Sequence, residues 1–549
     1  MHARRLWIPL LLLAGIGAGA RADAAQDPLA PLPAEQWTPA KAAHLLRRAA
    51  FGGTLEEVER LHALGPQGAV DALLDWDAKP DPGVPRLVIS VTARPTRAEL
   101  AALPDRDARQ KLLRDHRRRD LAQFAVIREW WIEAMLRSAY PLRERMTLFW
   151  HALFTSGQRD VRNSYHMYIQ NTLFRREAAG NFRRLLHAVS KDPAMLEYLD
   201  NNRNRKQHPN ENFAREVMEL FTLGVGHYTE KDIQEAARAF TGWTFAGNHF
   251  RYDLRQHDTG EKRFLGRAGN FDGDQVLDII LEQPAASRHL AARLFATFAH
   301  EHPSPAVVEG LARTLRESGW ELRPVLKRLF LSRAFYSPKA MGTRIKGPVE
   351  LLVGLSRSLD MDPRKTTGLS LLAAGLGQAL MEPPNVKGWA GGRAWITTSS
   401  LLHRYNVCGA LVGLPQDRLR TLRNQPGRMM RGMRYLQQAR RVDANGEETY
   451  GVAMGMAGMD RPKRRRGRGD VATYDVVAQV QGRGLEQAPD IVDYFSRTLL
   501  ANPPGPDLRA ALLAYLERDG GFYLDAPDAS QRLHGLLRLI VSTPEFQLS

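Results

Sequence analysis

The chain contains a single cysteine, Cys408, among its 549 residues. One cysteine cannot form a disulfide within the chain, and it cannot supply the set of thiolates that structural zinc and iron–sulfur sites require. The fold must therefore be stabilised by burial of apolar side chains. A chain of this length has ample residues for such a core.

Long apolar runs are also scarce. The one long run, residues 6–20, follows Arg4 and Arg5 and leads to small residues at 22–24, which is the order of a secretory signal peptide. No later stretch reaches the roughly eighteen apolar residues that a membrane span needs. We therefore expect residues 1–24 to be a signal peptide. The mature protein is expected to be exported, periplasmic or extracellular, with no transmembrane anchor.

Acidic residues are outnumbered, since 77 Lys and Arg face 60 Asp and Glu and give a net charge of +17. Loss of Arg4, Arg5, Arg21 and Asp23 with the signal peptide changes this to 17 − 3 + 1 = +15. Net charge governs non-specific attraction, and an exported basic protein meets anionic envelope glycans, lipids or polymers rather than nucleic acid. We therefore expect an anionic glycan as a partner and no nucleic acid.

Apolar residues recur at helical spacing along most of the chain. This pattern predicts a mainly α protein of orthogonally packed helices, with at most a small β-hairpin around Phe250 and Tyr252. Composition divides the mature chain into four parts: a Pro- and Ala-rich linker (25–37), a helical main domain (38–422), a basic Met- and Gly-rich insertion expected to be disordered (423–475), and a C-terminal helical segment that packs on the main domain (476–549). The insertion is either a solvated loop or an element that docks on an anionic surface.

The most concentrated polar chemistry lies in residues 208–223, which read HPNENFAREVMELFTL. At 100° per residue the stretch predicts one helix with an apolar face and a polar face. The polar face carries Glu211, Asn212, Arg215, Glu216 and Glu219. It is either a solvated face of weak ion pairs or a site in which Glu216 and Glu219 act as acid and base.

Polar residues elsewhere could complete such a site. His151 is eligible for proton transfer because an ordinary histidine titrates near neutrality, although packing is the commoner role for a helical histidine. A glycine- and proline-rich loop (382–400) presents Trp389 and Trp395, which either plug the core or form a binding wall. The expected catalytic residues are Glu216, Glu219, His151, His257 and Asp258. The expected substrate-binding residues are Asn210, Asn212, Arg215, His227, Lys262, Trp389, Arg393 and Trp395. We expect both sets to converge on one concave surface.

Several stretches together resemble the domain-of-unknown-function 1800 family of exported bacterial proteins. They are HLLRRAAFG (44–52), ERMTLFWHALF (144–154), NFRRLLHAVSKDPAMLEYLDN (181–201), HPNENFAREVMELFTLGVGHYTEKDI (208–233), ARAFTGWTF (237–245), HDTGEKRFLG (257–266), GNFDGDQVLDIIL (269–281), GPVELLVG (347–354), PPNVKGWAGGRAWI (383–396) and STPEFQ (542–547). The resemblance implies a mostly helical exported protein, often encoded beside a sulfatase-like partner protein. It implies no established reaction.

The chain departs from the family pattern just after His151. Family members commonly place another polar residue there, whereas this chain has Ala152 and Leu153. The departure argues against a metal site built on paired histidines. No HExxH or comparable spacing supports a metal-dependent hydrolase, so we expect no metal and no other cofactor.

The sequence is compatible with three functions. The first is an enzyme that acts on a cell-envelope or extracellular glycan, in which a partner from the His257–Asp258 loop would help Glu216 and Glu219, because cleavage needs one group on each side of the glycosidic bond. The second is a non-enzymatic binding or assembly partner of a sulfatase-like exported protein. The third is the metal-dependent hydrolase, which the sequence supports least.

Overall fold

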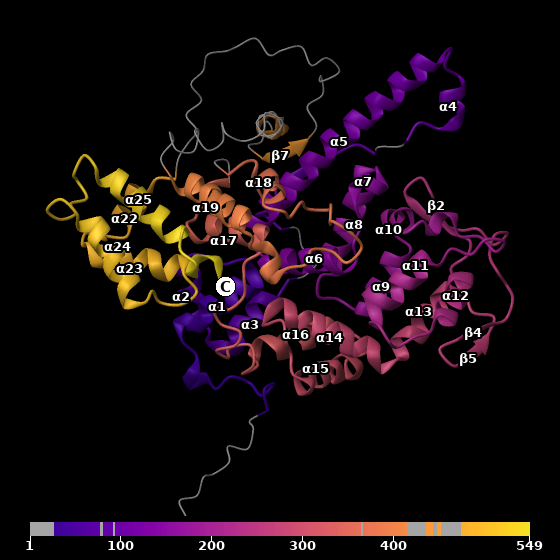
Figure 1. Cartoon of the computed structure of the whole chain (residues 1–549), viewed down its shortest axis with the longest axis horizontal. Coiled ribbons are helices and arrows are strands. Elements are labelled where there is room, and N and C mark those ends of the chain that lie inside the picture. Colours follow the sequence, from indigo (N-terminus) through magenta and orange to yellow (C-terminus); the bar gives the residue numbers. More distant parts are fainter. Residues whose placement is uncertain are drawn as a thin grey trace, which may run out of the picture.

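A computed structural model of the chain describes residues 27–76, 81–91, 94–363, 366–413, 435–442, 447–451 and 474–549. The described residues form many helices of varied direction and a few short strands, which confirms the prediction of a mainly α fold (Figure 1). The expected signal peptide, residues 1–24, lies outside the described residues. Within the described residues, no helix combines the length and apolar character that crossing a membrane requires.

Helices α1 (Pro39–Ala50) and α2 (Leu55–Ala63) each begin at a threonine cap. The Thr38 hydroxyl accepts a hydrogen bond from the backbone of Lys41, and Thr54 forms a capping box with Glu57. Such caps satisfy backbone N–H groups that a helix start would leave unpaired. Helix α3 (Gly65–Leu74) follows and packs on both.

The segment expected to be an extended linker, residues 25–37, is packed against the body where it is described. Leu29, Leu32 and Trp37 are buried, and the Leu32 N–H donates to the Leu331 carbonyl at 2.7 Å. Burial of three large apolar side chains stabilises this attachment. The segment therefore belongs to the main domain.

The longest helix, α5 (Arg106–Arg137), joins the core only through its C-terminal half. Trp131 on that half is fully buried, whereas most residues before Asp120 are exposed. The short helix α4 (Arg97–Ala101) and the first half of α5 project from the body at the upper right of Figure 1. The core helices α6 (Pro141–Leu153) and α8 (Ser164–Arg176) pack beside the buried half, and α9 (Phe182–Ser190) packs on α8.

The middle of the chain adds two small hairpins to the helices. In the first, β2 and β3 pair antiparallel with Phe245 opposite Phe250, so the hairpin predicted around Phe250 is present. The second hairpin pairs β4 with β5. The bounds are α12 (Glu230–Ala239), β2 (Trp243–Ala246), β3 (His249–Tyr252), β4 (Lys262–Phe264), β5 (Arg267–Gly269), α13 (Gly273–Glu282), α14 (Pro284–Phe298), α15 (Pro305–Glu317) and α16 (Leu322–Leu331).

The C-terminal third is helical and packs on the rest of the molecule. Helix α25 lies against α19, and α23 contacts α17, which places residues 476–549 on the main domain (Figure 1). The bounds are α17 (Pro348–Ser358), α18 (Leu369–Gly375), η5 (Gly392–Trp395), α19 (Thr398–Val412), α22 (Val476–Gly482), α23 (Ala488–Leu499), α24 (Pro506–Glu517) and α25 (Ala529–Val541).

The structure differs from the expectation that residues 423–475 are disordered throughout. Strands β6 (Arg440–Val442) and β7 (Glu448–Gly451) form a three-stranded sheet with β1 (Arg86–Val88), in the order β1-β7-β6. Tyr450 is 1% exposed, and its hydroxyl donates to the buried Glu133 of α5. Most of the remaining stretch lies outside the described residues.

A buried ion network ties distant helices together. Glu350 of α17 accepts hydrogen bonds from Arg145 of α6 and from Arg344. Burial alone would raise the pKa of Glu350, but the nearby arginine charges hold it well below its usual range. Arg48 of α1 donates to the Phe298 carbonyl at 2.8 Å and so caps the end of α14. Four helices far apart in sequence therefore meet at one charged centre.

Candidate functional site

The 208–223 stretch is not one uniform helix. It begins as α11 (Glu211–Glu216), capped by Asn210, and continues as a π-helix, η3 (Val217–Thr222). The Thr222 hydroxyl donates to the Val217 carbonyl at 2.6 Å. Because π-turns interrupt the regular i,i+4 ladder and often mark functional positions, the change of helix type at Glu216 singles out this point of the chain.

Glu216 is half-buried, and its carboxylate has no hydrogen-bond partner within the described part of the chain. Burial and the neighbouring charge of Glu219 raise its pKa, against the opposing charges of Lys387 and Arg215. Glu219 accepts a hydrogen bond from the Tyr228 hydroxyl at 3.0 Å. Burial and the nearby carboxylate therefore both favour the protonated form of Glu216.

A second element faces this position. The Tyr198 hydroxyl of α10 (Pro193–Tyr198) lies beside Thr155, and burial followed by the charge of Asp160 raises its pKa. The charge of Glu216 adds to that shift. Tyr198 is therefore near two carboxylates that come from different elements, Glu216 on α11 and Asp160 on α7 (Gln158–Val161). Sequence reasoning missed Asp160 and Tyr198, because nothing in their local pattern shows that α7 packs on α10 or that Tyr198 lies near Glu216.

The opposite part of the α11 polar face is an exposed ion-pair surface. Arg215 donates two hydrogen bonds to Glu230, at 2.8 and 2.9 Å, and one to Glu211 at 3.1 Å. The Glu230 side chain is 70% exposed, so these pairs contribute little to stability. The Asn212 amide instead donates to the Leu199 carbonyl at 3.2 Å, which fixes the start of α11.

The glycine- and proline-rich loop packs on the end of α6 and reaches Glu216. Gly388 has φ +77°, and a Cβ there would stand 2.7 Å from the Ala152 carbonyl, so only glycine fits this close approach. The Thr155 hydroxyl donates to the Val386 carbonyl at 2.7 Å. Lys387 lies between these two contacts. Its positive charge lowers the pKa of Glu216 and so acts against the increase that burial causes.

The two tryptophans of the loop are in different settings. Trp395 is half-buried. A Cβ built on Gly347 or on Gly377, at the ends of α17 and α18, would be in ordinary contact with its ring, so Trp395 packs between these two helix ends. Trp389 is also half-buried, and its Nε1 is buried without a hydrogen-bond partner in the described structure. Arg393 is exposed. Trp389 is therefore the better candidate for a wall of a binding site.

His151 lies in the core. It is 2% exposed, its Nε2 lies 3.2 Å from the Asn171 amide nitrogen, and the rings of Trp131 and Phe174 lie on either side with centroids 4.7 Å away. Burial, with a smaller contribution from the charge of Arg175, lowers the pKa of His151 to about 3. A histidine that stays neutral across the physiological range does not exchange protons there, so packing is the role that these contacts support.

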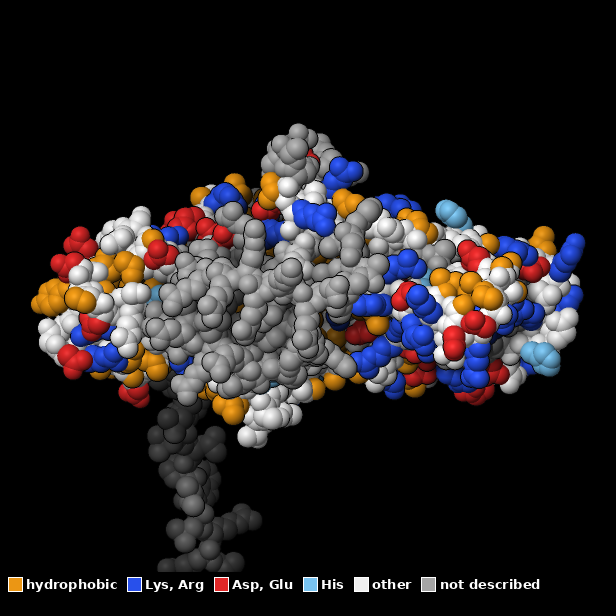
Figure 2. Space-filling model, turned by 90° about the horizontal axis from the view of Figure 1, so that it is seen from above, with side chains coloured by type: hydrophobic (Ala, Val, Ile, Leu, Met, Phe, Trp, Pro, Cys, Tyr) orange, Lys and Arg blue, Asp and Glu red, His pale blue; other side chains and the backbone are white. Residues whose placement is uncertain are grey.

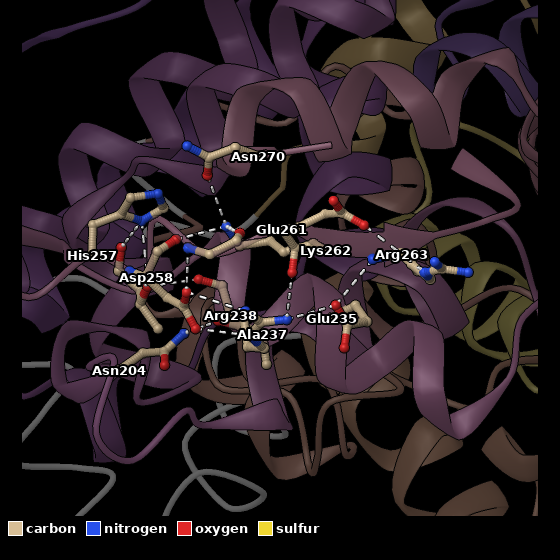
Figure 3. Close-up of polar contacts among 12 residues, drawn as sticks. Asn204, Glu235, Ala237, Arg238, His257, Asp258, Glu261, Lys262, Arg263 and Asn270 are labelled. Atoms are coloured by element: carbon tan, nitrogen blue, oxygen red, sulfur yellow. Dashed lines mark hydrogen bonds and ion pairs between the residues drawn. The ribbon is translucent and has the colours of Figure 1, made fainter. Parts of the chain in front are cut away.

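The predicted turn at 257–262 forms a closed network of its own (Figure 3). The Asp258 carboxylate accepts hydrogen bonds of 2.8 and 3.2 Å from Arg238, which lower its pKa. The Lys262 ammonium donates to the carbonyls of Asp258 and Gly260, at 2.6 and 3.1 Å. His257 Nδ1 lies 3.0 Å from the Thr241 carbonyl. These bonds hold the turn, and none of them joins it to Glu216.

His227 follows the π-helix on an exposed turn. Its charge lowers the pKa of His289, although burial of His289 is the larger cause. His289 Nε2 in turn lies 3.0 Å from the Leu220 carbonyl, so it can satisfy a carbonyl of the π-helix. His227 is therefore adjacent to the helix that carries Glu219, but it has no contact that links it to Glu216.

Two clefts lie away from the predicted residues. One, of about 950 Å³, runs between α2, the end of α5 and β7. The other, of about 310 Å³, is mostly apolar and includes Asp192, the cap of α10. Burial raises the pKa of Asp192 to about 7. The local sequence does not reveal this shift, because the burial of Asp192 depends on tertiary packing. Within the described residues, no three His, Cys, Asp or Glu side chains are grouped as metal ligands.

Comparison with protein families gives one clear result. Residues 44–548 match the sequence profile of the family described as "Protein of unknown function (DUF1800)", which covers nearly the whole chain. Comparison with curated proteins and comparison with solved structures each gave no match. The extent of the profile match confirms the resemblance seen in the sequence, and the chain belongs to the DUF1800 family.

Proposed function

We propose that the protein is a hydrolase that acts on a cell-envelope or extracellular glycan, with Glu216 as the proton donor. The observation that supports this most is the placement of Glu216 and Asp160 on different elements, both near the Tyr198 hydroxyl. Glycosidic cleavage commonly uses two carboxyl groups that flank the bond. Glu216 and Glu219 lie three residues apart in sequence and do not meet that need alone, so the second group in this proposal is Asp160 on α7.

Each group has a distinct role in this proposal. Glu216, whose pKa is raised by burial and by the charge of Glu219, gives its proton to the leaving oxygen. Asp160 is exposed and activates the attacking water. Tyr198, between them, donates a hydrogen bond to the bound sugar. Trp389, on the loop that carries Lys387, offers an aromatic face for a sugar ring.

The proposal includes export, because a glycan of the envelope is reached only outside the cytoplasm. Residues 1–24 have the charge, apolar and cleavage regions of a signal peptide. A fusion of residues 1–30 to a reporter that is active only outside the cytoplasm should give signal. A stable but silent fusion would remove this part of the proposal.

The test is release of reducing ends from a panel of envelope polysaccharides by the purified mature protein. Glu216→Gln and Asp160→Asn should each lower the rate by at least about 100-fold while the fold is kept, because each removes one of the two carboxyl groups. Glu309→Gln, which changes a partly exposed carboxylate on α15, is the matched control and should keep the rate. Wild-type rates retained by both site variants would contradict the proposal.

A second function has its own supporting observation. The Arg215, Glu211 and Glu230 ion pairs form an exposed charged surface, which suits a binding or assembly partner of a sulfatase-like exported protein. Recovery of such a protein in fixed ratio from the native envelope, lost on Arg215→Glu, would favour it. The same preparation showing no release of reducing ends would favour it over the hydrolase.

A further inference from the structure

The projecting arm of the molecule, residues 97–119, is strongly basic. It contains eight Lys and Arg and four Asp and Glu, so its net charge is 8 − 4 = +4. Most of these residues are exposed, because this half of α5 has little packed against it. Lys and Arg side chains are also dense on the right half of Figure 2, the half that carries the arm and α7 in Figure 1.

The cations of the arm are largely unpaired. Five exposed side chains have no hydrogen-bond or ion-pair partner in the described structure: Arg97, Arg106, Lys111, Arg118 and Arg119. Two of the four acidic residues are already engaged, since Glu99 and Asp105 accept backbone N–H groups as helix caps. The positive field of the arm is therefore not cancelled within the arm.

The arm starts at the proposed site. Its root residue, Asp120, accepts hydrogen bonds from the Gln158 amide at 2.7 Å and from the Ser164 N–H at 2.6 Å, and Gln158 begins the helix that carries Asp160. Arg94, just before the arm, donates to the Val161 carbonyl and, at 3.1 Å, to Glu197 beside Tyr198. A chain bound along the arm therefore leads to Asp160 and Tyr198.

We infer that the arm binds an acidic polysaccharide and guides it to the carboxylate site. This inference rests on the proposed function and names its substrate class, a glycan that carries a regular row of carboxylates or other anions. The exposed part of α5 from Arg106 to Arg119 is about 21 Å long, enough to lie along several sugar units. Electrostatic attraction of this kind speeds encounter and sets orientation.

The arm is less suited to a membrane surface. A helix that lies in a bilayer interface needs a continuous apolar face. The exposed apolar side chains here are Leu113 (46%) and Leu121 (44%), two turns apart, with Arg114, Arg117 and Arg118 between them in sequence. Apolar and basic side chains therefore alternate along the exposed helix. This arrangement suits a charged polymer in solution, because each arginine can reach an anion while the helix stays exposed.

The test measures binding, not cleavage. The probes are a polyuronate and the same polymer with its carboxyl groups reduced to alcohols, each titrated against the full mature protein at low salt. The arm variant is Lys111→Gln/Arg118→Gln/Arg119→Gln. The control variant, Arg60→Gln/Arg313→Gln/Lys339→Gln, removes the same charge from exposed positions elsewhere. The arm variant should lose affinity for the polyuronate by about 10-fold or more, and the control by less than about 2-fold.

Several outcomes would overturn the inference. Equal losses in both variants would show an effect of net charge alone. Equal affinity for the reduced polymer would show that the anions are not recognised. Tighter binding to vesicles of phosphatidylcholine and phosphatidylglycerol than to the polyuronate would assign the arm to a membrane. Arm-dependent binding by a protein that releases no reducing ends would overturn the hydrolase proposal alone, whereas release of reducing ends without arm-dependent binding would overturn this inference alone.

Discussion

His187 links α9 to α13 through contacts with two carboxylates, and the strength of these contacts depends on pH. Its Nδ1 lies 2.8 Å from Asp274 and its Nε2 3.1 Å from Asp278, both on α13. Burial alone would lower the pKa of His187, but hydrogen bonds to these carboxylates outweigh it and raise the pKa. Lys191 and Arg183 also pair with the two aspartates, so the aspartates remain neutralised in part when His187 loses its proton.

The sign of the expected effect follows from the raised pKa. Stabilisation by the charged His187 is fully present below the unfolded-state value of about 6.5 and is lost as the pH rises through the folded-state pKa. Because the groups are partly exposed, the loss should be below about 1 kcal/mol. Urea unfolding between pH 5.5 and 8.5 should show this decline in the wild type and a flatter profile in His187→Gln. An identical decline in both proteins would rule out this origin.

At the same scale, His151 and Asp160 show what a sequence can and cannot reveal. The sequence identified His151 as a histidine able to titrate, but its neighbours Trp131 and Phe174 come from other helices, and their packing lowers its pKa to about 3. Asp160 lies in an unremarkable polar stretch, and only the approach of α7 to Tyr198 makes it a candidate. The chemical type of each residue could be read from the sequence, whereas its burial and its neighbours in the fold could not.

At the scale of elements, the buried network at Glu350 gives the clearest prediction. Glu350→Gln should lower the free energy of unfolding by roughly 3–5 kcal/mol, because Arg145 and Arg344 would remain near the core without their carboxylate. Chemical denaturation measures this directly.

The control for this prediction is Glu309→Gln on α15. Glu309 pairs with Arg288 and Arg316 on the surface, and its loss should cost no more than about 1 kcal/mol. Comparable losses in the two variants would show that the Glu350 network adds no more than a surface ion pair.

Helix ends were predictable from local chemistry, but helix type was not. Thr38, Thr54 and Thr229 each cap the helix that follows, and each cap depends only on residues within one turn. The π-turn at 217–222 was missed, since a 100° period fits its apolar residues well enough to suggest a regular α-helix. The junction between α11 and the π-helix, at which Glu216 lies, is therefore visible only in the structure.

At the scale of the whole molecule, the sheet β1-β7-β6 joins segments from opposite ends of the chain. Its composition suggested a removable insertion, but Tyr450 and its contact with Glu133 belong to the core. Deleting residues 435–451 should therefore lower the melting temperature by at least about 3 °C, because Glu133 loses a buried partner and apolar area is exposed.

A smaller change tests the same contact. Tyr450→Phe keeps the ring and removes only the hydroxyl that bonds to Glu133, so it should account for part of that loss. A deletion variant that melts at the wild-type temperature would show that β6 and β7 do not contribute to the fold.

The class of the fold and the family were both accessible from the sequence, because they depend on periodicity and on motifs spread over the chain. The convergence of the candidate residues was predicted less well. Lys387 does reach Glu216, but the His257–Asp258 turn closes on Arg238 and Lys262 instead. The types of these residues suggested that their side chains share one surface. The hydrogen bonds in the structure instead place the side chains in separate groups.

The central claim is that Glu216 is the acid of a glycan-cleaving site and that Glu219 raises its pKa. The most direct measurement is the pH dependence of reducing-end release by the wild type and by Glu219→Gln. Removing the Glu219 charge should lower the pKa of Glu216, so the alkaline limb of the profile should move to lower pH, while Glu309→Gln leaves it in place. An alkaline limb that is the same in all three proteins would contradict the account.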